Sequence, residues 1–282
     1  MGALYLVATP IGNLEDITLR ALRVLREARL IAAEDTRHTR KLLTHFAIAT
    51  PTISYHEHSP QAREERLLTE LALGDVALVS DAGTPAISDP GQALVRAALV
   101  AGYAVIPIPG AVAAITALIA SGLPTDHFTY LGFLPRRPAE RRVALMEVAH
   151  LPHTLIIYEA PHRLLATLDD LLATLGDRQV VIARELTKFH EQWLRGSLAA
   201  VRAQCGESGP RGEYTLVVAG ASAMASALAG EGTASQEEQA RALIRELLAQ
   251  GVRTRDAATQ AAAATGIARR VAYQLALELA KS

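Results

Sequence analysis

The chain has 282 residues and a formal net charge of -1, with 50% hydrophobic and 20% charged residues. This composition is typical of a soluble globular protein that is long enough for two domains. No apolar run approaches the ~20 residues of a membrane span, and the start of the chain lacks a signal-peptide pattern. The single cysteine, Cys205, excludes an internal disulfide and fits a reducing compartment, so we expect a cytoplasmic protein. Because no apolar run is long enough to span a membrane, we also expect no membrane binding.

Residues 1–121 alternate short apolar runs with helical patterns, which predicts an N-terminal α/β domain. Apolar strands separated by helices indicate a mostly parallel sheet with helices on both faces. The predicted elements are strands over residues 4–8, 30–33, 52–54, 76–79 and 105–108, and helices over 17–28, 63–73, 93–100 and 111–120.

The sequence Ser-Gly-Leu-Pro at 121–124 breaks this alternation and predicts a domain boundary. We predict a second α/β domain over 122–222, a polar linker over 221–235, and a helical module of helix-turn-helix type over 236–282. Gly251 is expected to end the first helix of the module, and Gly266 to separate the other two. The elements predicted after the boundary are strands over 129–133, 154–158, 180–183 and 214–218, and helices over 139–149, 163–175, 257–264 and 268–279.

Three loops rich in turn formers follow predicted strands, at residues 8–18, 80–91 and 107–114. The carboxyl ends of strands are where open α/β sheets bind ligands, so these loops predict one pocket. Neither a dinucleotide fingerprint nor a P-loop occurs, and the loops lack the basic cluster of a polyphosphate site. A nucleoside with a small or zwitterionic tail therefore fits better than a nucleotide. Close helix packing explains the small residues of the third loop equally well.

Six sequence blocks, taken in order, resemble the small-subunit ribosomal RNA methyltransferases of the tetrapyrrole methylase superfamily. The resemblance covers about residues 3–220, and the C-terminal module is also similar. It implies two α/β domains with S-adenosylmethionine in the cleft between them. It further implies 2'-O-methylation of a cytidine in small-subunit ribosomal RNA, in the assembled subunit, by a homodimer. The blocks are VATPIGNLEDIT at 7–18, AEDTR at 33–37, SDAGTPAISDPG at 80–91, GFLPR at 132–136, YEAPHR at 158–163 and ARELTK at 183–188.

The resemblance also implies which residues contact the cofactor. Superfamily members that act on tetrapyrroles usually have Gly-Asp-Pro where this chain has Ser80, Asp81 and Ala82, so the chain departs from their pattern there. The cofactor contacts implied are Ile11, Gly12, Ser80, Asp81, Thr84, Val112, Ala113, Tyr158, Glu159 and Leu186.

Methylation of a ribose hydroxyl is helped by a group that removes its proton as attack proceeds. No sequence signature singles one residue out, and a lysine could act only if its pKa were lowered. Lys188 is equally well explained as a structural or phosphate-contacting residue. The candidates by residue type are Lys188, Glu185, Glu159 and Asp35.

An RNA substrate must be held by local positive charge. Basic runs also occur on ordinary solvated helix faces, so their presence favours RNA binding without requiring it. Few aromatic residues are available to stack on a base: Tyr55, Phe133, Tyr158 and Phe189. The basic candidates are Arg37, Arg40 and Lys41, then Arg136, Arg137, Arg141 and Arg142, and finally residues 241–282, where seven basic residues outnumber three acidic ones.

Two further features indicate no additional chemistry. His56 and His58 lie two residues apart, but no third ligand is evident, so we predict no metal. Cys205 is placed in a Gly-rich loop and is expected to be inert.

Two alternative functions stay open at this point. One keeps the cofactor and methylates a tetrapyrrole or a protein side chain. The other is a non-catalytic RNA-binding or ribosome-assembly factor that retains a nucleoside pocket for stability.

Overall fold

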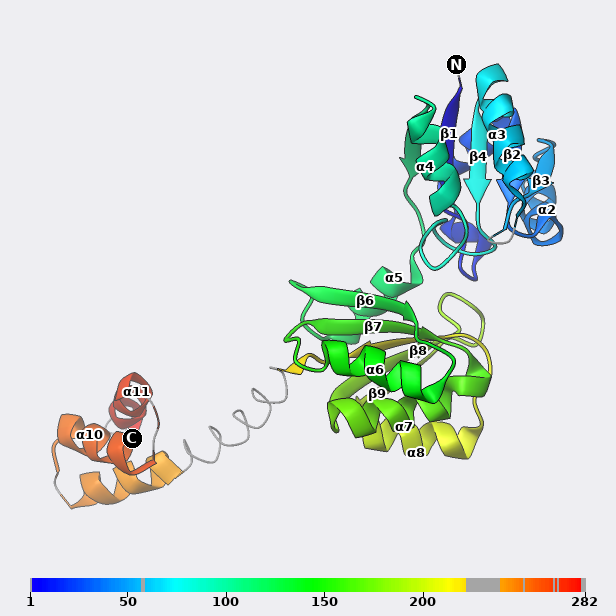
Figure 1. The fold of residues 1–282 in the computed structure, drawn as a ribbon. Helices are drawn as coiled ribbons and strands as arrows, with labels where there is room; N and C mark the ends of the chain where they lie inside the picture. The colour runs from blue at the N-terminus through cyan, green and yellow to red at the C-terminus, as the bar shows by residue number, and fades with distance from the viewer. Residues whose placement is uncertain are drawn as a thin grey trace. The chain divides into compact units, whose positions relative to one another are not determined.

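The computed structural model describes residues 2–56, 59–221, 239–250, 252–265, 267 and 269–279. The chain divides into two compact units, Met1–Gly220 and Ala221–Ser282 (Figure 1). Nearly all of the predicted linker, together with Gly251 and Gly266, lies outside the described residues.

The first half of the N-terminal unit is a five-stranded sheet in the order β3-β2-β4-β1-β5. Every pairing in it is parallel, as the alternation of apolar runs and helices predicted. Its elements are β1 (Ala3–Val7), η1 (Leu14–Asp16), α1 (Leu19–Glu27), β2 (Leu30–Ala33), α2 (Thr36–His45), β3 (Thr52–Ser54), α3 (Gln61–Leu73), β4 (Val76–Val79), α4 (Gln92–Val100) and β5 (Ala104–Ile108).

Helices cover both faces of this sheet. On one face, Val7 and Val79 share a buried cluster with Leu25 of α1. On the other face, Leu78 shares a buried cluster with Leu94 of α4. Successive strand residues point to opposite faces, so both must be apolar when both faces are covered. This is why the strands read as continuous apolar runs.

The order of the strands creates a topological switch point between β1 and β4. These strands are neighbours, yet the helices that follow them, α1 and α4, pack on opposite faces of the sheet. The carboxyl ends of strands at such a switch point are where α/β sheets of this kind bind ligands.

The second half of the N-terminal unit is a mixed sheet in the order β6-β7-β10-β8-β9. Only β6 and β7 are parallel. Helix α5 shares a buried cluster with one face, and α7 and α8 with the other (Figure 1). The elements are α5 (Ala113–Ser121), β6 (Phe128–Phe133), α6 (Pro138–Val148), β7 (Thr154–Glu159), η2 (Pro161–Arg163), α7 (Leu164–Leu175), β8 (Gln179–Arg184), β9 (Gln192–Ser197), α8 (Leu198–Ser208) and β10 (Tyr214–Val218).

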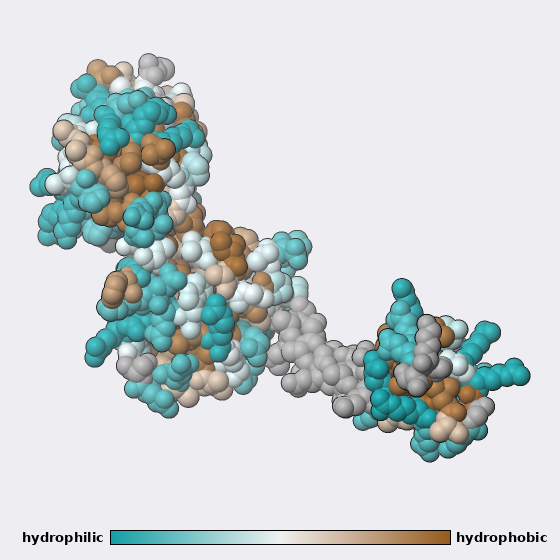
Figure 2. Space-filling model, turned by 180° about the vertical axis from the view of Figure 1, so that it is seen from behind, coloured by the Kyte–Doolittle hydropathy of each residue, from teal (hydrophilic) through white to brown (hydrophobic). Residues whose placement is uncertain are grey.

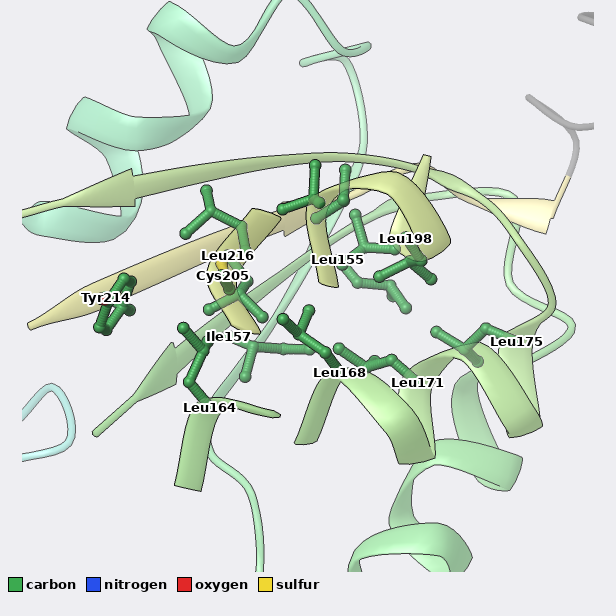
Figure 3. Packing of buried hydrophobic residues seen from close by; sticks show 14 of the residues in the cluster. Leu155, Ile157, Leu164, Leu168, Leu171, Leu175, Leu198, Cys205, Tyr214 and Leu216 are labelled. Carbon is green, nitrogen blue, oxygen red and sulfur yellow. The ribbon is translucent and has the colours of Figure 1, made fainter. Parts of the chain in front are cut away.

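The prediction that Cys205 lies in a loop is wrong. The sequence placed it in a Gly-rich loop, but it lies in α8 and is 2% exposed. Figure 3 shows it among the leucines of the buried cluster that α7 and α8 form with the second sheet, near Leu216. Glycine near the end of α8 made this segment look like a loop, whereas burial against the sheet stabilises it as a helix.

Helix α2 and strand β9 were also missed by the sequence analysis. Asp35 caps α2 by accepting a hydrogen bond from the Arg37 N–H at 2.8 Å. Strand β9 is short of apolar residues and lies at the edge of the second sheet. Pairing with β8, rather than its own composition, makes it a strand.

Within the described residues, the C-terminal unit includes a helix over residues 239–249, α10 (Thr254–Thr265) and α11 (Arg269–Leu279). Small side chains such as Ala240, Ala258 and Ala261 pack with Ile244 and Leu275 in its core. On the face shown in Figure 2, hydrophilic side chains surround small hydrophobic areas of this unit. A helical module was predicted here from the same alanine and leucine pattern.

Candidate functional site

The loops after β1 and β4 are joined to each other at the switch point. The Thr9 N–H donates to the Gly83 carbonyl at 2.8 Å, and the Gly83 N–H donates to the Thr9 carbonyl at 3.1 Å. Gly83 has φ +77°, a conformation that favours glycine, and a Cβ there would lie 3.2 Å from Ile11 Cγ2. This bridge fixes two of the three loops that the sequence analysis singled out.

A cavity of about 400 Å³ opens beside this bridge, lined by residues from both halves of the N-terminal unit. Eight of the ten residues proposed as cofactor contacts lie on its wall. These are Ile11, Asp81, Thr84, Val112, Ala113, Tyr158, Glu159 and Leu186.

The other two proposed contacts, Gly12 and Ser80, are not on this wall. A Cβ on Gly12 would lie 2.5 Å from Lys188 Cγ and 2.8 Å from the Leu186 carbonyl oxygen, so Gly12 allows the first loop to approach the second sheet closely. Ser80 is 2% exposed, and its hydroxyl donates to the Ala82 carbonyl at 3.3 Å. In this structure, both residues shape the loops beside the cavity.

An aromatic cluster forms one side of the cavity. The Tyr158 ring meets Tyr130 and Phe133 edge to face, with ring centres 5.3 and 5.6 Å apart. Its hydroxyl accepts a hydrogen bond from the Ala114 N–H at 3.0 Å, which ties β7 to the start of α5. Burial raises the pKa of Tyr158, so the ring stays uncharged at neutral pH.

Carboxylates occupy the other end of the cavity. Asp81 Oδ1 accepts from the Asp35 N–H at 3.0 Å, and the Asp81 N–H donates to Glu34 Oε2 at 3.3 Å. Burial raises the pKa of Glu34. Burial also raises the pKa of Asp89 to about 6; Ser80 opposes this shift, and the charges of Glu34 and Asp81 add to it.

The sequence analysis named neither Glu34 nor Asp89 as a site residue. The available signals were positional. Glu34 directly follows β2, and Asp89 is the second carboxylate of the loop after β4. Parallel strands end at the same edge of a sheet, so both carboxylates reach one pocket.

The lining has the chemistry of a site for a cationic nucleoside. Among the lining residues, all within the described part of the chain, none is lysine, arginine or histidine. Ile11, Val112 and Leu186 supply apolar surface, while Glu34, Asp81 and Asp89 supply negative charge. A polyphosphate would be repelled, whereas S-adenosylmethionine, a nucleoside bearing a sulfonium and an amino acid group, fits these residues.

Lys188 does not meet the condition set for it as a base. Its Nζ lies 2.9 Å from Glu185 Oε1 and 2.8 Å from Glu213 Oε2. Burial favours a lower pKa for Lys188, but the hydrogen bonds to the two carboxylates outweigh it and the pKa is raised. Lys188 is therefore protonated at neutral pH, and Glu185 is engaged as its partner.

The other two candidate bases, Glu159 and Asp35, form hydrogen bonds within the protein. Glu159 is 2% exposed and accepts hydrogen bonds from the Ala160 N–H at 2.8 Å and the Thr167 hydroxyl at 2.5 Å. Asp35 caps α2 and pairs with Arg37 at 2.7 Å, and this partner holds the pKa of the Asp35 carboxyl well below its usual range. Both carboxylates are thus engaged as acceptors within the protein.

The arginines of the predicted basic clusters differ in solvent exposure and in ion pairing. Arg40, Arg136 and Arg137 are exposed, although Arg137 lies 3.0 Å from Glu140. Arg37 is exposed but paired with Asp35.

Arg141 was wrongly included in the second cluster. It is 3% exposed and forms an ion pair with Asp170 at 2.6 Å, between α6 and α7. In the C-terminal unit, Arg241 lies 3.3 Å from Glu278.

The double change of Arg136→Ala and Arg137→Ala is expected to weaken RNA binding several-fold and to flatten its salt dependence, because each phosphate contact releases counterions. Fluorescence anisotropy of labelled RNA over a salt series measures both effects. Arg23→Ala with Arg26→Ala, on exposed positions of α1, is the control. An unchanged salt slope in the double variant would show that Arg136 and Arg137 only face solvent.

In the ranges that the structure describes, no group of three or more His, Cys, Asp or Glu residues could hold a metal ion; Glu57 and His58 lie outside them. Among the same residues, no helix is long and apolar enough to cross a membrane.

Comparison with known families assigns the chain to a class. Residues 3–202 match the family described as Tetrapyrrole (Corrin/Porphyrin) Methylases. Residues 233–280 match the RsmI C-terminal HTH domain, which confirms the predicted helix-turn-helix module. The chain belongs to the tetrapyrrole methylase family and is therefore a methyltransferase by descent.

Full-length relatives give the particular branch of the family. The chain is 53% identical to the Ribosomal RNA small subunit methyltransferase I of Synechocystis, over 99% of each chain. It is 51% identical to the protein of the same name from Halalkalibacterium halodurans, over 97% of this chain and 94% of that one. The resemblance found in the sequence motifs is confirmed, and the chain groups with the ribosomal RNA small subunit methyltransferases I.

Solved structures confirm the predicted fold class. A uroporphyrin-III C-methyltransferase from Thermus thermophilus, complexed with S-adenosylhomocysteine, has a TM-score of 0.54 and 23% identity to this chain. The match covers 77% of this chain and 97% of that one. An architecture of two α/β halves is thus shared with the solved tetrapyrrole methyltransferases.

Proposed function

We propose that this enzyme transfers a methyl group from S-adenosylmethionine to the 2'-oxygen of a cytidine ribose in small-subunit ribosomal RNA. The names of the relatives over the full length of the chain support ribosomal RNA as the substrate. The observation that carries the cofactor assignment is the cavity at the switch point, whose lining is apolar and acidic with no basic side chain among the described residues.

Different residues of the cavity would bind different parts of this cofactor. Ile11, Val112 and Leu186 offer apolar surface to the adenosine part, and Asp81 offers a carboxylate to its polar groups. Tyr158 and Ala114 fix the wall between β7 and α5. S-adenosylmethionine supplies an electrophilic methyl group on a sulfonium. Negative charge in the cavity favours a cationic cofactor over its neutral product after transfer.

Asp89 is the side chain best placed to take the proton of the 2'-hydroxyl. It lines the cofactor cavity and also a wider groove of about 720 Å³, which includes Tyr55 and His56. A carboxylate shared by both spaces can face cofactor and acceptor together. Its pKa of about 6 leaves it ionised near neutral pH while keeping it more basic than an exposed aspartate.

The backbone around Asp89 is held in an unusual conformation. Ala86 and Ser88 have φ values of 69° and 59°, which non-glycine residues rarely adopt. The Ser88 hydroxyl lies 2.7 Å from the Tyr130 hydroxyl, across to the second sheet. Such strained positions cluster at functional sites, which supports a functional role for the segment that carries Asp89.

The remaining parts of the proposal concern the substrate particle and the form of the enzyme. We place the acceptor cytidine in the assembled small subunit and the enzyme in the cytoplasm, acting as a homodimer, as the motif resemblance implies. Light scattering of the purified protein tests the dimer directly.

A tetrapyrrole or protein acceptor and a non-catalytic assembly role are the competing functions. The exposed arginines of α2 and of the segment before α6, together with a helix-turn-helix domain, favour RNA over a tetrapyrrole. The family is one of methyltransferases, which favours catalysis over a binding role.

Methyl transfer to purified subunits tests the proposal. Labelled S-adenosylmethionine is incubated with small ribosomal subunits that lack their native modifications, and 2'-O-methylation is mapped along the RNA. Label at a single cytidine ribose is the expected result. Cofactor binding without any transfer would favour the assembly role, and label elsewhere would change the acceptor.

A further inference from the structure

A second cavity, of about 230 Å³, adjoins the cofactor cavity and has no part in the proposed chemistry. It lies between the loop after β1 and helix α2, and Asp81 lines both cavities. Its wall includes Pro10, Leu14 and Thr39. The loop bridge between Thr9 and Gly83 and the hydrogen bond from Asp35 to Asp81 keep this wall in place.

Thr39 gives this cavity a polar group without a partner. Thr39 is 3% exposed, and its hydroxyl has no hydrogen-bond partner in the described part of the chain. Two other helix threonines donate their hydroxyl to the carbonyl four residues back: Thr116 to Val112 at 2.9 Å, and Thr265 to Ala261 at 2.8 Å. A buried hydroxyl left unsatisfied is destabilising, so a ligand that bonds it recovers this free energy.

The remainder of the cavity suits a flat ring joined to a phosphate. Pro10, Leu14 and Leu42 are apolar, and they line the cavity together with Thr39. His38 and Lys41 also line the cavity and are exposed on α2. No acidic side chain within the described ranges forms an ion pair with Lys41, so its charge is available to an anion.

The size and position of this cavity indicate that it does not hold the ribose that is methylated. Pockets that enclose drug-sized ligands measure about 300–1,000 Å³, so a cavity of 230 Å³ holds one ring rather than a whole nucleoside. Asp89, the proposed proton acceptor, lines the cofactor cavity and the wide groove but not this cavity. The ring that enters it therefore belongs to another nucleotide of the same strand.

We propose that this cavity binds one base of the RNA next to the methylated cytidine, with the Thr39 hydroxyl bonded to the edge of the base and Lys41 and His38 on its phosphate. This inference rests on RNA being the substrate, as proposed above. It gives helix α2 a defined role in selecting the strand position, because a base bound here fixes which neighbouring ribose reaches Asp89.

Two replacements at Thr39 test this assignment in the full chain. Thr39→Val keeps the shape and removes the hydroxyl, and Thr39→Met fills the cavity with a flexible side chain. Thr44→Val, on an exposed position of the same helix, is the matched control. We measure KM for unmodified small subunits, anisotropy of a fluorescein-labelled single-stranded octacytidylate, S-adenosylmethionine affinity by calorimetry, and Tm.

The expected pattern separates a binding role from a structural one. Thr39→Val should raise KM and weaken octacytidylate binding about fivefold, and Thr39→Met at least tenfold. Both variants should keep the wild-type cofactor affinity, because Thr39 does not line the cofactor cavity. Their Tm should be equal to or above that of the wild type, since an unpaired buried hydroxyl is removed. Thr44→Val should match the wild type throughout.

The outcomes distinguish failure of this inference from failure of the proposed function. If wild-type protein methylates subunits and both Thr39 variants match it in KM and RNA binding, the cavity assignment is overturned and the function stands. If wild-type protein transfers no methyl group but binds octacytidylate more tightly than Thr39→Met, the proposed function fails, and the cavity is a site for an RNA base that has no methylated neighbour. Absence of both transfer and RNA binding overturns both.

Discussion

Replacing Asp81 by asparagine is expected to weaken S-adenosylmethionine binding by about 10- to 100-fold, because a hydrogen bond to a charged group is worth roughly 1.5–3 kcal/mol. The asparagine carbonyl can still accept from the Asp35 N–H, which lies 3.0 Å from Asp81 Oδ1, so the loop should keep its shape. Isothermal calorimetry with S-adenosylmethionine measures the loss of affinity directly.

Asp75→Asn is the matched control for Asp81→Asn. Asp75 precedes the same strand, β4, at its opposite end, and its Oδ1 accepts from the Ala3 N–H at 2.8 Å. This replacement should leave cofactor affinity unchanged. If Asp81→Asn binds S-adenosylmethionine with wild-type affinity, Asp81 does not contact the cofactor. Glu34 or Asp89 would then supply the carboxylate that does.

Asp89→Asn is expected to lower kcat by about 10²- to 10⁴-fold, the usual contribution of a positioned base, while cofactor affinity changes little. In the wild type, kcat should fall as pH drops through about 6, because Asp89 then becomes protonated. The variant should lack this acidic limb. A pH profile of kcat at saturating substrate measures both effects.

The same replacement should stabilise the fold. The pKa of Asp89 is raised in the folded state from 3.8 to about 6. The folded state therefore binds the proton more tightly, and the free energy of unfolding of the wild type falls as pH rises from about 3.8 to about 6. Above pH 6, Asp89→Asn removes this penalty, on the order of 1 kcal/mol for a half-buried group, and Tm should rise.

Glu34→Gln is the comparison that assigns the base. Glu34 lines the same cavity and groove as Asp89, and burial raises its pKa as well. Loss of the acidic limb in Glu34→Gln, with a normal profile in Asp89→Asn, would transfer the role to Glu34. Loss of cofactor affinity in Asp89→Asn would instead make it a binding residue.

The strands of the first sheet were predictable because their burial is encoded locally. Val76–Val79 is apolar throughout, since α1 and α4 cover both faces of β4. The loops that follow such strands carry glycine and proline at positions such as Gly83, whose positive φ other residues rarely adopt. Local composition therefore identified both the sheet and the loops that form the pocket.

The environment of each charged side chain was not predictable in this way. The sequences around Arg137 and Arg141 are equally basic, yet Arg137 is exposed and Arg141 is buried against Asp170. Lys188 could be a base only with a lowered pKa, but Glu213, distant in sequence, helps to raise it. A pKa depends on partners that the fold brings together, and sequence spacing does not show them.

The sequence by itself determined the alternation of strands and helices, the three loops at the carboxyl ends of strands, and the family to which the blocks belong. Short-range patterns of burial and turn formation record these features, and they act within about ten residues. Only the tertiary structure decided which carboxylates share the cavity, that Arg141, Glu159 and Lys188 are engaged within the protein, and that the Thr39 hydroxyl has no hydrogen-bond partner among the described residues. These outcomes depend on contacts between distant segments, whose energies no local pattern contains.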